Sequence, residues 1–261
     1  MKNRIIFLTA GLLLLILTSC VKDLFCVNGN GIIEVERRRL TSFDQIQNST
    51  SFEVVYKKAD TLGASIRAEQ NIIEYIETHV HDGFLEIRTK PGSICLDCTE
   101  QPLITISSPN LKGATISGSG ELSADTMAGE TVTLKISGSG DLSVHQAICD
   151  DSQLTVSGSG SIAISELFCV NSDIQISGSG KITLNGDCET EHLRISGSGN
   201  IHAFNFTVQS ANITISGSGD AYTNIETYLN GHISGSGNIH VIGDPNFDQI
   251  ITGSGRIIKH K

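Results

Sequence analysis

A short motif, Ser-Gly-Ser-Gly, recurs through the second half of this chain and constrains its fold more than any other feature. Successive copies are separated by 20, 20, 20, 19, 20, 18 and 18 residues, and they begin at Ser117, Ser137, Ser157, Ser177, Ser196, Ser216, Ser234 and, as a variant, Thr252. A near-constant period of this length is typical of stacked repeat proteins, in which each unit buries its apolar face only against its neighbours. The sequence therefore predicts a solenoid.

Apolar and polar residues alternate on both sides of each motif. The residue just before each copy is apolar, from Ile116 to Ile251, and so is the residue five positions after its start, from Leu122 to Ile257. Alternation with period two indicates half-buried strands, and glycine supplies the backbone angles of a corner. We expect each period to hold a strand, a corner, a second strand and a variable return. The fold class predicted is all-β, a right-handed parallel β-helix with coils of roughly 20 residues.

Three cysteines support the same period. Cys149, Cys169 and Cys188 each lie eight residues before a repeat serine, so they share one position in three successive coils. Because free cysteine is commonly buried, we interpret them as an inward ladder of thiols. The alternative is one disulfide between adjacent coils, although parallel Cβ vectors fit a bridge poorly.

The N-terminus has the features of an export signal. Residues 1–19 carry Lys2 and Arg4 before an apolar run that is short for a membrane span. The following Leu-Thr-Ser-Cys resembles the lipobox of bacterial lipoproteins, which implies cleavage before Cys20 and its lipidation. The alternative is an ordinary signal peptide with an incidental cysteine. Residues 20–31 then form the lipidated tether, and the protein is expected on a membrane of the bacterial cell envelope. We expect the outer membrane, with the protein facing the periplasm or the surface.

The net charge argues against two classes of partner. Removing residues 1–19 takes away two of the 18 basic residues and none of the 28 acidic ones, which leaves a net charge of −12. Such an acidic protein is not expected to bind nucleic acid or to dock electrostatically on anionic lipid.

The region before the repeats is also rich in β patterns. We expect a single domain over residues 32–261, with an irregular β half at 32–110 that caps or begins the solenoid and repeat coils at 111–261. One helical turn is expected near residues 71–76 and a turn at Asp82-Gly83. The expected strands are 32–35, 52–56, 65–68, 84–88 and 103–107.

The order of motifs resembles a known family. After the export signal come Leu-Thr-Ser-Phe-Asp-Gln-Ile at 40–46, Asn-Ile-Ile at 71–73, Leu-Glu-Ile at 85–87, and Ser-Gly-Ser-Gly-Asn-Ile at 196–201 and 234–239. Together they resemble the "putative auto-transporter adhesin, head GIN domain" family of Bacteroidetes lipoproteins, over nearly all of residues 27–261. The resemblance implies a right-handed β-helix, a cell-surface or periplasmic setting and an adhesive role. The family supplies no established catalytic residues to carry over.

The remaining cysteines favour a disulfide over a metal site. Cys95 and Cys98 form a Cys-x-x-Cys pair, and an exported protein can join them to each other or join either one to Cys26. A zinc site needs four ligands, so His79 and His81 would have to lie close to this pair. We predict a disulfide among the three cysteines, and no metal or cofactor.

An enzyme that acts on polysaccharides is the main rival. It would need paired carboxylates on an exposed face and aromatic side chains to hold sugars. The only acidic group found is Asp150, Asp151 and Asp173, which we interpret as a solvated loop, and the Phe and Tyr residues are not expected to form a ladder across coils. We therefore predict a non-enzymatic, lipid-anchored binding module whose ligand is a glycan or an extracellular protein. A purely structural or envelope-sensing protein is the remaining alternative.

Overall fold

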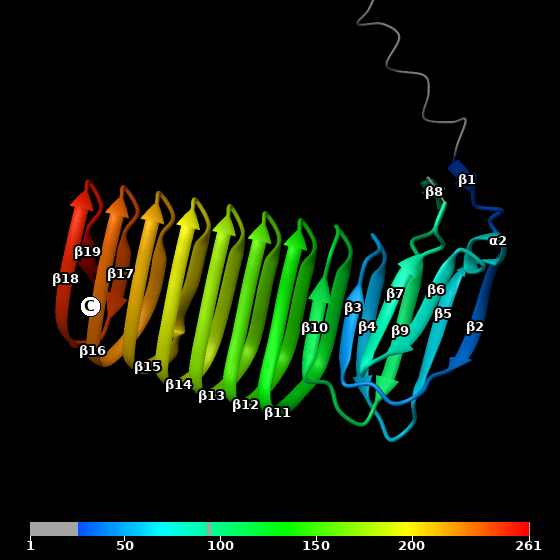
Figure 1. The fold of residues 1–261 in the computed structure, drawn as a ribbon, viewed down its shortest axis with the longest axis horizontal. Coiled ribbons are helices and arrows are strands. Elements are labelled where there is room, and N and C mark those ends of the chain that lie inside the picture. Colours follow the sequence, from blue (N-terminus) through cyan, green and yellow to red (C-terminus); the bar gives the residue numbers. More distant parts are fainter. Residues whose placement is uncertain (1–25, 93–94, 261) are drawn as a thin grey trace, which may run out of the picture.

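The computed structural model describes residues 26–92 and 95–260, so the predicted signal peptide and Cys20 lie outside the described residues. Strands account for 73% of the structure and helix for 2%, and stacked parallel coils form a β-solenoid of about 7 turns. The predicted all-β solenoid is confirmed. Figure 1 shows the coils side by side along the length of the molecule, with an irregular β region at the N-terminal end.

The regular coils are formed by long strands that end at the first glycine of each motif. These strands are β11 (Glu121–Gly138), β12 (Asp141–Gly158), β13 (Ser161–Gly178), β14 (Lys181–Gly197), β15 (Asn200–Gly217) and β16 (Ala221–Gly235). Shorter strands complete the stack: β17 (Ile239–Ile242), β18 (Asn246–Gly253) and β19 (Ile257–Lys259). All of these neighbours pair in parallel, and the positions that flank each motif pair in the register of the repeat, whereas register shifts interrupt the β13–β14, β14–β15 and β15–β16 pairings. The return that we expected to be variable is therefore itself a strand.

Burial along β12 explains why the return is ordered. Three stretches of alternating buried and outward residues are separated by outward pairs at His145-Gln146 and Asp150-Asp151. Each coil thus has three sides, and the third corner is the motif itself. The side chains directed inward are Leu142, Val144, Ala147, Cys149, Ser152, Leu154 and Val156. Because every side has its own inward residues, the coil encloses one continuous core.

Backbone contacts hold the motif corners together. The backbone N–H groups of Ser159 and Gly160 both donate to the carbonyl of Gly138 in the preceding coil, at 2.9 and 3.1 Å. Gly158 has φ +136°, and a Cβ there would lie 2.3 Å from the same carbonyl oxygen. Only glycine accommodates both this backbone conformation and this close approach.

The N-terminal region forms both the first coils of the solenoid and the cap that closes this end. Its strands are β2 (Ile33–Arg39), β3 (Gln45–Asn48), β4 (Glu53–Lys58), β5 (Gly63–Glu69), β6 (Ile76–His81), β7 (Phe84–Thr89), β9 (Leu103–Ser108) and β10 (Gly113–Ile116). Strands β3 and β4 pair in parallel with β10 and β11, and on their other side they pair in parallel with β7 and β9. Two divided coils therefore precede the Ser-Gly repeats. The five strands predicted here overlap β2, β4, β5, β7 and β9, whereas β3, β6 and the short strands at 26–28 and 95–97 were not predicted.

Antiparallel strands then close this end. Strand β5 lies antiparallel to both β2 and β9, and β6 lies antiparallel to β7 through a turn at Asp82 and Gly83, which have φ +50° and +81°. The predicted turn is confirmed. The helical turn is α2 (Gln70–Ile73), with Ile72 and Ile73 buried. Because the pairing changes from parallel to antiparallel, this end of the stack does not present a parallel strand edge on which another solenoid could add.

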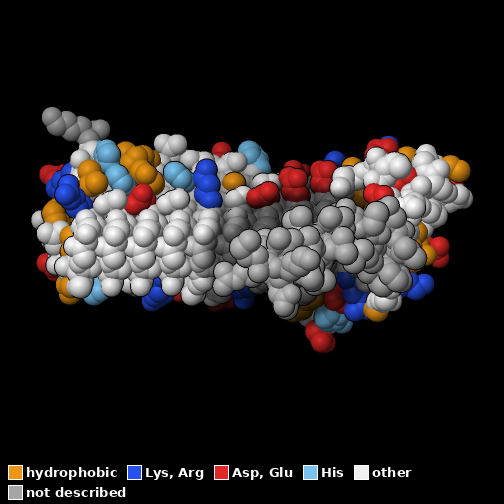
Figure 2. All heavy atoms as spheres, turned by 90° about the horizontal axis from the view of Figure 1, so that it is seen from above, with side chains coloured by type: hydrophobic (Ala, Val, Ile, Leu, Met, Phe, Trp, Pro, Cys, Tyr) orange, Lys and Arg blue, Asp and Glu red, His pale blue; other side chains and the backbone are white. Residues whose placement is uncertain are grey.

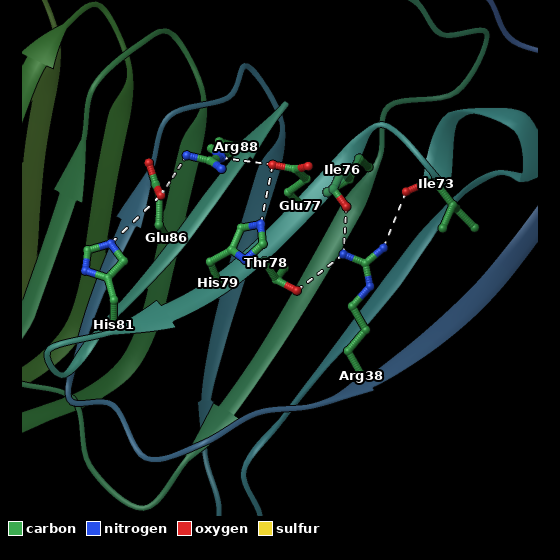
Figure 3. Close-up of polar contacts among 9 residues, drawn as sticks. All are labelled: Arg38, Ile73, Ile76, Glu77, Thr78, His79, His81, Glu86 and Arg88. Atoms are coloured by element: carbon green, nitrogen blue, oxygen red, sulfur yellow. Dashed lines mark hydrogen bonds and ion pairs between the residues drawn. The ribbon is translucent and has the colours of Figure 1, made fainter. Parts of the chain in front are cut away.

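Side-chain bonds fasten the cap, as Figure 3 shows. Arg38 of β2 donates through Nη1 to the carbonyl of Ile76 at 2.6 Å and through Nη2 to that of Ile73 at 3.4 Å. Arg88 bridges Glu77 and Glu86 across the β6–β7 hairpin, at 3.0 and 3.3 Å. These contacts join strand β2, the helical turn and the hairpin into one unit.

A small parallel sheet sits beside the cap. It consists of β1 (Cys26–Asn28) and β8 (Cys95–Asp97), and Cys26 and Cys95 form a disulfide between them. The buried carboxylate of Glu69 accepts hydrogen bonds from the backbone N–H of Gly31 at 2.7 Å and from the N–H and hydroxyl of Thr99 at 3.0 and 2.8 Å. The disulfide and Glu69 together attach both outer segments to β5.

Candidate functional site

One outward position of the coil changes character along the solenoid. Six residues after the start of each motif stand the small residues Ser123, Ser143, Ala163 and Thr183, and then the ring residues His202, Tyr222 and His240. Thr183, His202, Tyr222 and His240 pair in register across β14 to β17. In β15 this position lies between the buried residues Ile201 and Ala203, so the alternation of the strand directs the ring outward.

The rings stack along the axis of the solenoid. His202 and Tyr222 have centroids 5.0 Å apart and an interplanar angle of 5°, and Tyr222 and His240 are 4.4 Å apart at 10°. His260 continues the row, with Nδ1 of His240 and Nε2 of His260 2.8 Å apart. Phe204 stands perpendicular to Tyr222, at 90° and 5.5 Å. We call these five residues the ring row. Figure 2 shows hydrophobic and histidine side chains gathered over the C-terminal coils along one long edge.

A groove lies where the ring row meets the small residues. It has a volume of about 430 Å³ and is lined by Thr183, Leu184, Asn185, His202, Phe204, Asn205 and Tyr222. The repeat is irregular at this place. Thr183 pairs with His202 and Asn185 with Asn205, so β15 carries one residue more than β14 between these pairs. A strand with an extra residue bends outward, and this bulge raises Phe204 and Asn205 beside the shorter coil.

The lining of the groove is uncharged near neutral pH. Burial, followed by the positive charge of Lys181, holds the pKa of His202 below its usual value. Burial also lowers the pKa of His240; the carboxylate of Asp220 raises it, and His260 lowers it further. Since an imidazole with a lowered pKa is neutral at pH 7, rings and neutral amides and hydroxyls make up the site.

The ring row corrects one expectation from the sequence. We did not expect a ladder of Phe and Tyr across coils, but Tyr222 and Phe204 belong to one that histidines complete. The outward position between the inward residues five and seven after each motif start holds small side chains in the first four coils, so rings were not expected there. The signal was present there as His202, Tyr222 and His240, each six residues after a motif start.

The predicted site residues near the N-terminus are brought together only in part. Cys26 is bonded to Cys95, and Cys98 is a half-buried free thiol whose pKa is raised chiefly by burial. His79 lies 3.4 Å from Glu77, and His81 lies 3.9 Å from Glu86, on the outer face of the hairpin (Figure 3). Across residues 26–92 and 95–260, no group of three or more His, Cys, Asp or Glu side chains is arranged to hold a metal ion.

The other three cysteines are free thiols on one side of the core. Cys169 and Cys188 pair in register and Cys188 pairs with Val208, as the shared coil position requires. Cys149 and Cys188 are buried, whereas Cys169 is half-buried. Burial raises the pKa of the Cys149 thiol to about 11, and a hydrogen bond with Cys188, followed by burial, raises that of Cys169. Thiols with raised pKa values carry little reactive thiolate.

Beside these thiols lies a buried carboxyl that was not predicted from the sequence. Glu191 is fully buried, and in the described part of the chain neither of its carboxylate oxygens has a hydrogen-bond partner. Ser172, its register partner, and Ser152 in the coil before also have unpartnered hydroxyls. Burial raises the pKa of Glu191 to about 7. The signal was a glutamate at an inward position that otherwise holds small or apolar residues.

The acidic group considered for catalysis is dispersed. Asp151 pairs with Asn171 and receives a hydrogen bond from its amide at 2.9 Å, while Asp173 pairs with Gln153 and lies 3.5 Å from Arg194. Asp150 is exposed and directed away from the core. Asp173 is therefore two residues out of register with Asp151, and both have polar partners at the surface. No helix within residues 26–92 and 95–260 is long and apolar enough to cross a membrane.

Comparison with known proteins places this geometry in a family. A family model described as "putative auto-transporter adhesin, head GIN domain" matches residues 42–245. A crystal structure of "a putative adhesin" from Parabacteroides merdae is 24% identical, with a TM-score of 0.86 over 90% of this chain and 99% of that chain. A "putative lipid binding protein" from Parabacteroides distasonis is 27% identical, with a TM-score of 0.85 over 90% of this chain and 100% of that chain.

A third solved structure agrees in fold. A "putative adhesin" from Bacteroides fragilis is 21% identical, with a TM-score of 0.69 over 90% of this chain and 100% of that chain. Among curated proteins, no sequence matches this chain. The solved structures share the solenoid and its cap, since each is covered over essentially its whole length.

Proposed function

This chain belongs to the family described as "putative auto-transporter adhesin, head GIN domain", and from that premise we propose that it is a non-enzymatic binding module of the bacterial cell envelope. The family and its structural neighbours suggest an adhesin-like protein of the cell surface or envelope. The observation that carries the proposal is the ring row and its groove, which a rigid stack of coils presents at the surface. Concave, partly apolar surfaces of this kind are where ligands bind.

The anchor is the second element of the proposal. Cleavage before Cys20 and its lipidation would attach the chain to a membrane a few residues before strand β1, which is bound to the cap. The measurement is mass spectrometry of the N-terminal peptide, together with the distribution of protein between membrane and soluble fractions. Wild-type protein is expected to carry acyl chains and to sediment with membranes. A Cys20→Ala variant should lose both properties, and an unmodified wild-type peptide would contradict the anchor.

Binding and catalysis can be tested in the same wells. Mature protein, residues 20–261, is incubated with polysaccharides and extracellular-matrix proteins, and bound protein and newly released sugar ends are both measured. Saturable binding without new sugar ends is the expected result. Release of new sugar ends would replace this proposal with the rival one, an enzyme that acts on polysaccharides. Absence of binding to every member of the panel would favour a structural or envelope-sensing role.

The rival enzyme gains one feature from the structure. An exposed aromatic row was the feature expected to favour it, and the ring row provides one. However, no Asp or Glu is among the residues that line the groove in the described structure, and the Asp151 and Asp173 carboxylates are bonded to polar partners elsewhere. Glycoside cleavage by the usual route needs two carboxylates beside the bond that breaks. The groove therefore supports binding better than cleavage.

A further inference from the structure

We propose that the groove at the start of the ring row is a subsite for a neutral sugar unit of a glycan. The inference deepens the proposed function and rests on it, because it names the ligand class of a binding module. It is carried by three features of the groove: uncovered ring faces, side chains without hydrogen-bond partners in the protein, and the absence of formal charge among its lining residues.

A ring face is available at the groove end of the row. Both faces of Tyr222 are covered, by His202 on one side and His240 on the other. His202 has one face against Tyr222, while its register partner on the opposite side is the short Thr183. Phe204 stands at 90° to Tyr222 and also lines the groove. An apolar C–H face of a pyranose can pack on these ring faces, as flat apolar groups do in aromatic-lined pockets.

Three polar side chains around these rings are free to form hydrogen bonds with a ligand. Within the described residues, the side chains of Thr183, Asn185 and Asn205 make no hydrogen bond to the protein. Each asparagine offers one carbonyl acceptor and two N–H donors, and threonine offers a hydroxyl that can act both ways. Sugar hydroxyls need both kinds of partner. The extra residue in β15 places Asn205 opposite Asn185, so amides stand on two neighbouring coils beside the rings.

Charge selects the class of sugar. Thr, Leu, Asn, Phe and Tyr carry no charge at pH 7, and the lowered pKa of His202 leaves its imidazole neutral there. The chain as a whole has a formal net charge of −10, which disfavours uronic acids and sulfated glycans. The hollow at the opposite end, of about 320 Å³ beside Arg37 and Arg38, contains no aromatic ring, and Arg38 is already engaged by backbone carbonyls.

The first test is binding of defined probes to the detergent-solubilised full-length protein. The probes are neutral hexasaccharides of glucose, mannose, galactose and N-acetylglucosamine, an acidic hexagalacturonate, and vesicles of phosphatidylcholine. Saturable binding of at least one neutral hexasaccharide, tighter than that of the hexagalacturonate, is the expected result. Binding of hexagalacturonate alone, of vesicles alone or of none of these probes would overturn the proposal.

Variants locate the site. Thr183→Phe extends the ring row by one ring, covers the free face of His202 and fills the groove without removing a contact, so it should abolish binding. Phe204→Ala and Asn205→Ala should weaken it by about tenfold and a few-fold respectively. His145→Ala, an exposed histidine two coils away, is the matched control and should bind as the wild type does. Thermal unfolding of each variant verifies that it is folded. Equal affinity in wild type and Thr183→Phe would place the sugar elsewhere and overturn the proposal.

Failure of this inference can be told apart from failure of the proposed function. The same variants are tested for attachment to the matrix proteins and polysaccharides of the first panel. If the wild type attaches there and Thr183→Phe attaches equally, the binding module stands and the subsite is wrong. If the wild type attaches to nothing, the proposed function itself is wrong.

Discussion

Two corners of the same solenoid are held by opposite means. At residues 49–52, in the N-terminal region, side chains form the corner: Asn48 accepts from the N–H and hydroxyl of Thr50 at 3.0 and 2.7 Å, and its amide donates to the carbonyl of Phe52 at 3.1 Å. At residues 157–160 the corner is hydrogen-bonded to the preceding coil through backbone groups. Asn48 and Thr50 are buried, whereas the repeat corners, apart from Thr252, contain only serine and glycine.

The difference follows from how many neighbours a corner has. The corner at Asn48 and Thr50 occurs once, so large side chains can be fitted to its particular surroundings. A repeat corner has similar corners both above and below it, and glycine lets the backbones approach closely enough to bond directly. The corner in the N-terminal region thus depends on individual side-chain contacts, whereas the repeat corners depend on glycines that let the backbones of neighbouring coils approach.

The largest expected effect breaks the glycine ladder. Gly158→Ala places a Cβ 2.3 Å from the carbonyl oxygen of Gly138 in a backbone conformation with φ +136°. We expect it to lower the free energy of unfolding by roughly 5 kcal/mol, since steric overlap and backbone strain add. Urea denaturation measures the loss. Gly92→Ala is the control, because Gly92 has φ +89° but no atom lies within 4 Å of the position that a Cβ would take; it should cost about 1 kcal/mol. Equal losses would refute the role of stacking.

The second effect tests the covalent link of the N-terminal region. Cys26 and Cys95 are 69 residues apart in sequence, and closing a loop of that length is worth roughly 4 kcal/mol by chain entropy. The double variant Cys26→Ala/Cys95→Ala should therefore lose about that much stability in non-reducing urea titrations. Cys98→Ala removes a free thiol nearby and should change little. A double variant as stable as the wild type would show that this link does not stabilise the cap.

The third effect concerns Glu191, a buried carboxyl in the coils, and is compared below with Glu69, a buried carboxyl in the N-terminal region. Glu191 lies in the coils without a hydrogen-bond partner, and burial raises its pKa from 4.5 to about 7. Because the unfolded chain loses this proton first, stability should fall as pH rises from about 4.5 to 7 and then level off, by roughly 3 kcal/mol in all. Glu191→Gln should remove this decline and be the more stable protein at pH 8. Glu189→Gln, at an exposed position, should retain the decline. Identical pH profiles for wild type and Glu191→Gln would contradict the assignment.

The smallest effect is expected at Glu69, with the opposite sign. Burial by itself raises the pKa of this carboxyl, but the bonds from Thr99 and Gly31 outweigh it and leave the pKa below its usual value. Its contribution to stability is therefore complete above the pKa of the unfolded carboxyl and is lost as pH falls through the folded pKa. Glu69→Gln keeps one acceptor oxygen, so it should be less stable than wild type at pH 7 and approach it in acid. A stability difference that grows in acid would be inconsistent with this account.

The coils could be predicted from the sequence more fully than the N-terminal region, because the coils repeat and the N-terminal region does not. The repeat made the regular coils evident, because eight copies of one pattern report the same inward and outward positions. The divided coils formed by β3 with β4 and by β7 with β9 carry no Ser-Gly motif, and an insertion that contains β8 separates β7 from β9. Local patterns identified some of these strands but not their parallel pairing with the solenoid.

The candidate site could be predicted from the sequence only in part. The outward rings at His202, Tyr222 and His240 could have been found from the period alone. The groove could not, because it arises where β14 is one residue shorter than β15 between paired positions, and only paired strands show which side chains then face one another.

By itself, the sequence determined the period, the two strands that flank each motif and the residues of those strands that face the core, because alternation and recurrence are properties of the chain read locally. Tertiary structure alone decided that Cys26 bonds to Cys95, that Glu69 has partners while Glu191 has none, and that a groove opens beside His202. These outcomes depend on which residues distant in sequence come within bonding distance. Their proximity is set by the pairing of strands that are distant in sequence, and no single strand contains that information.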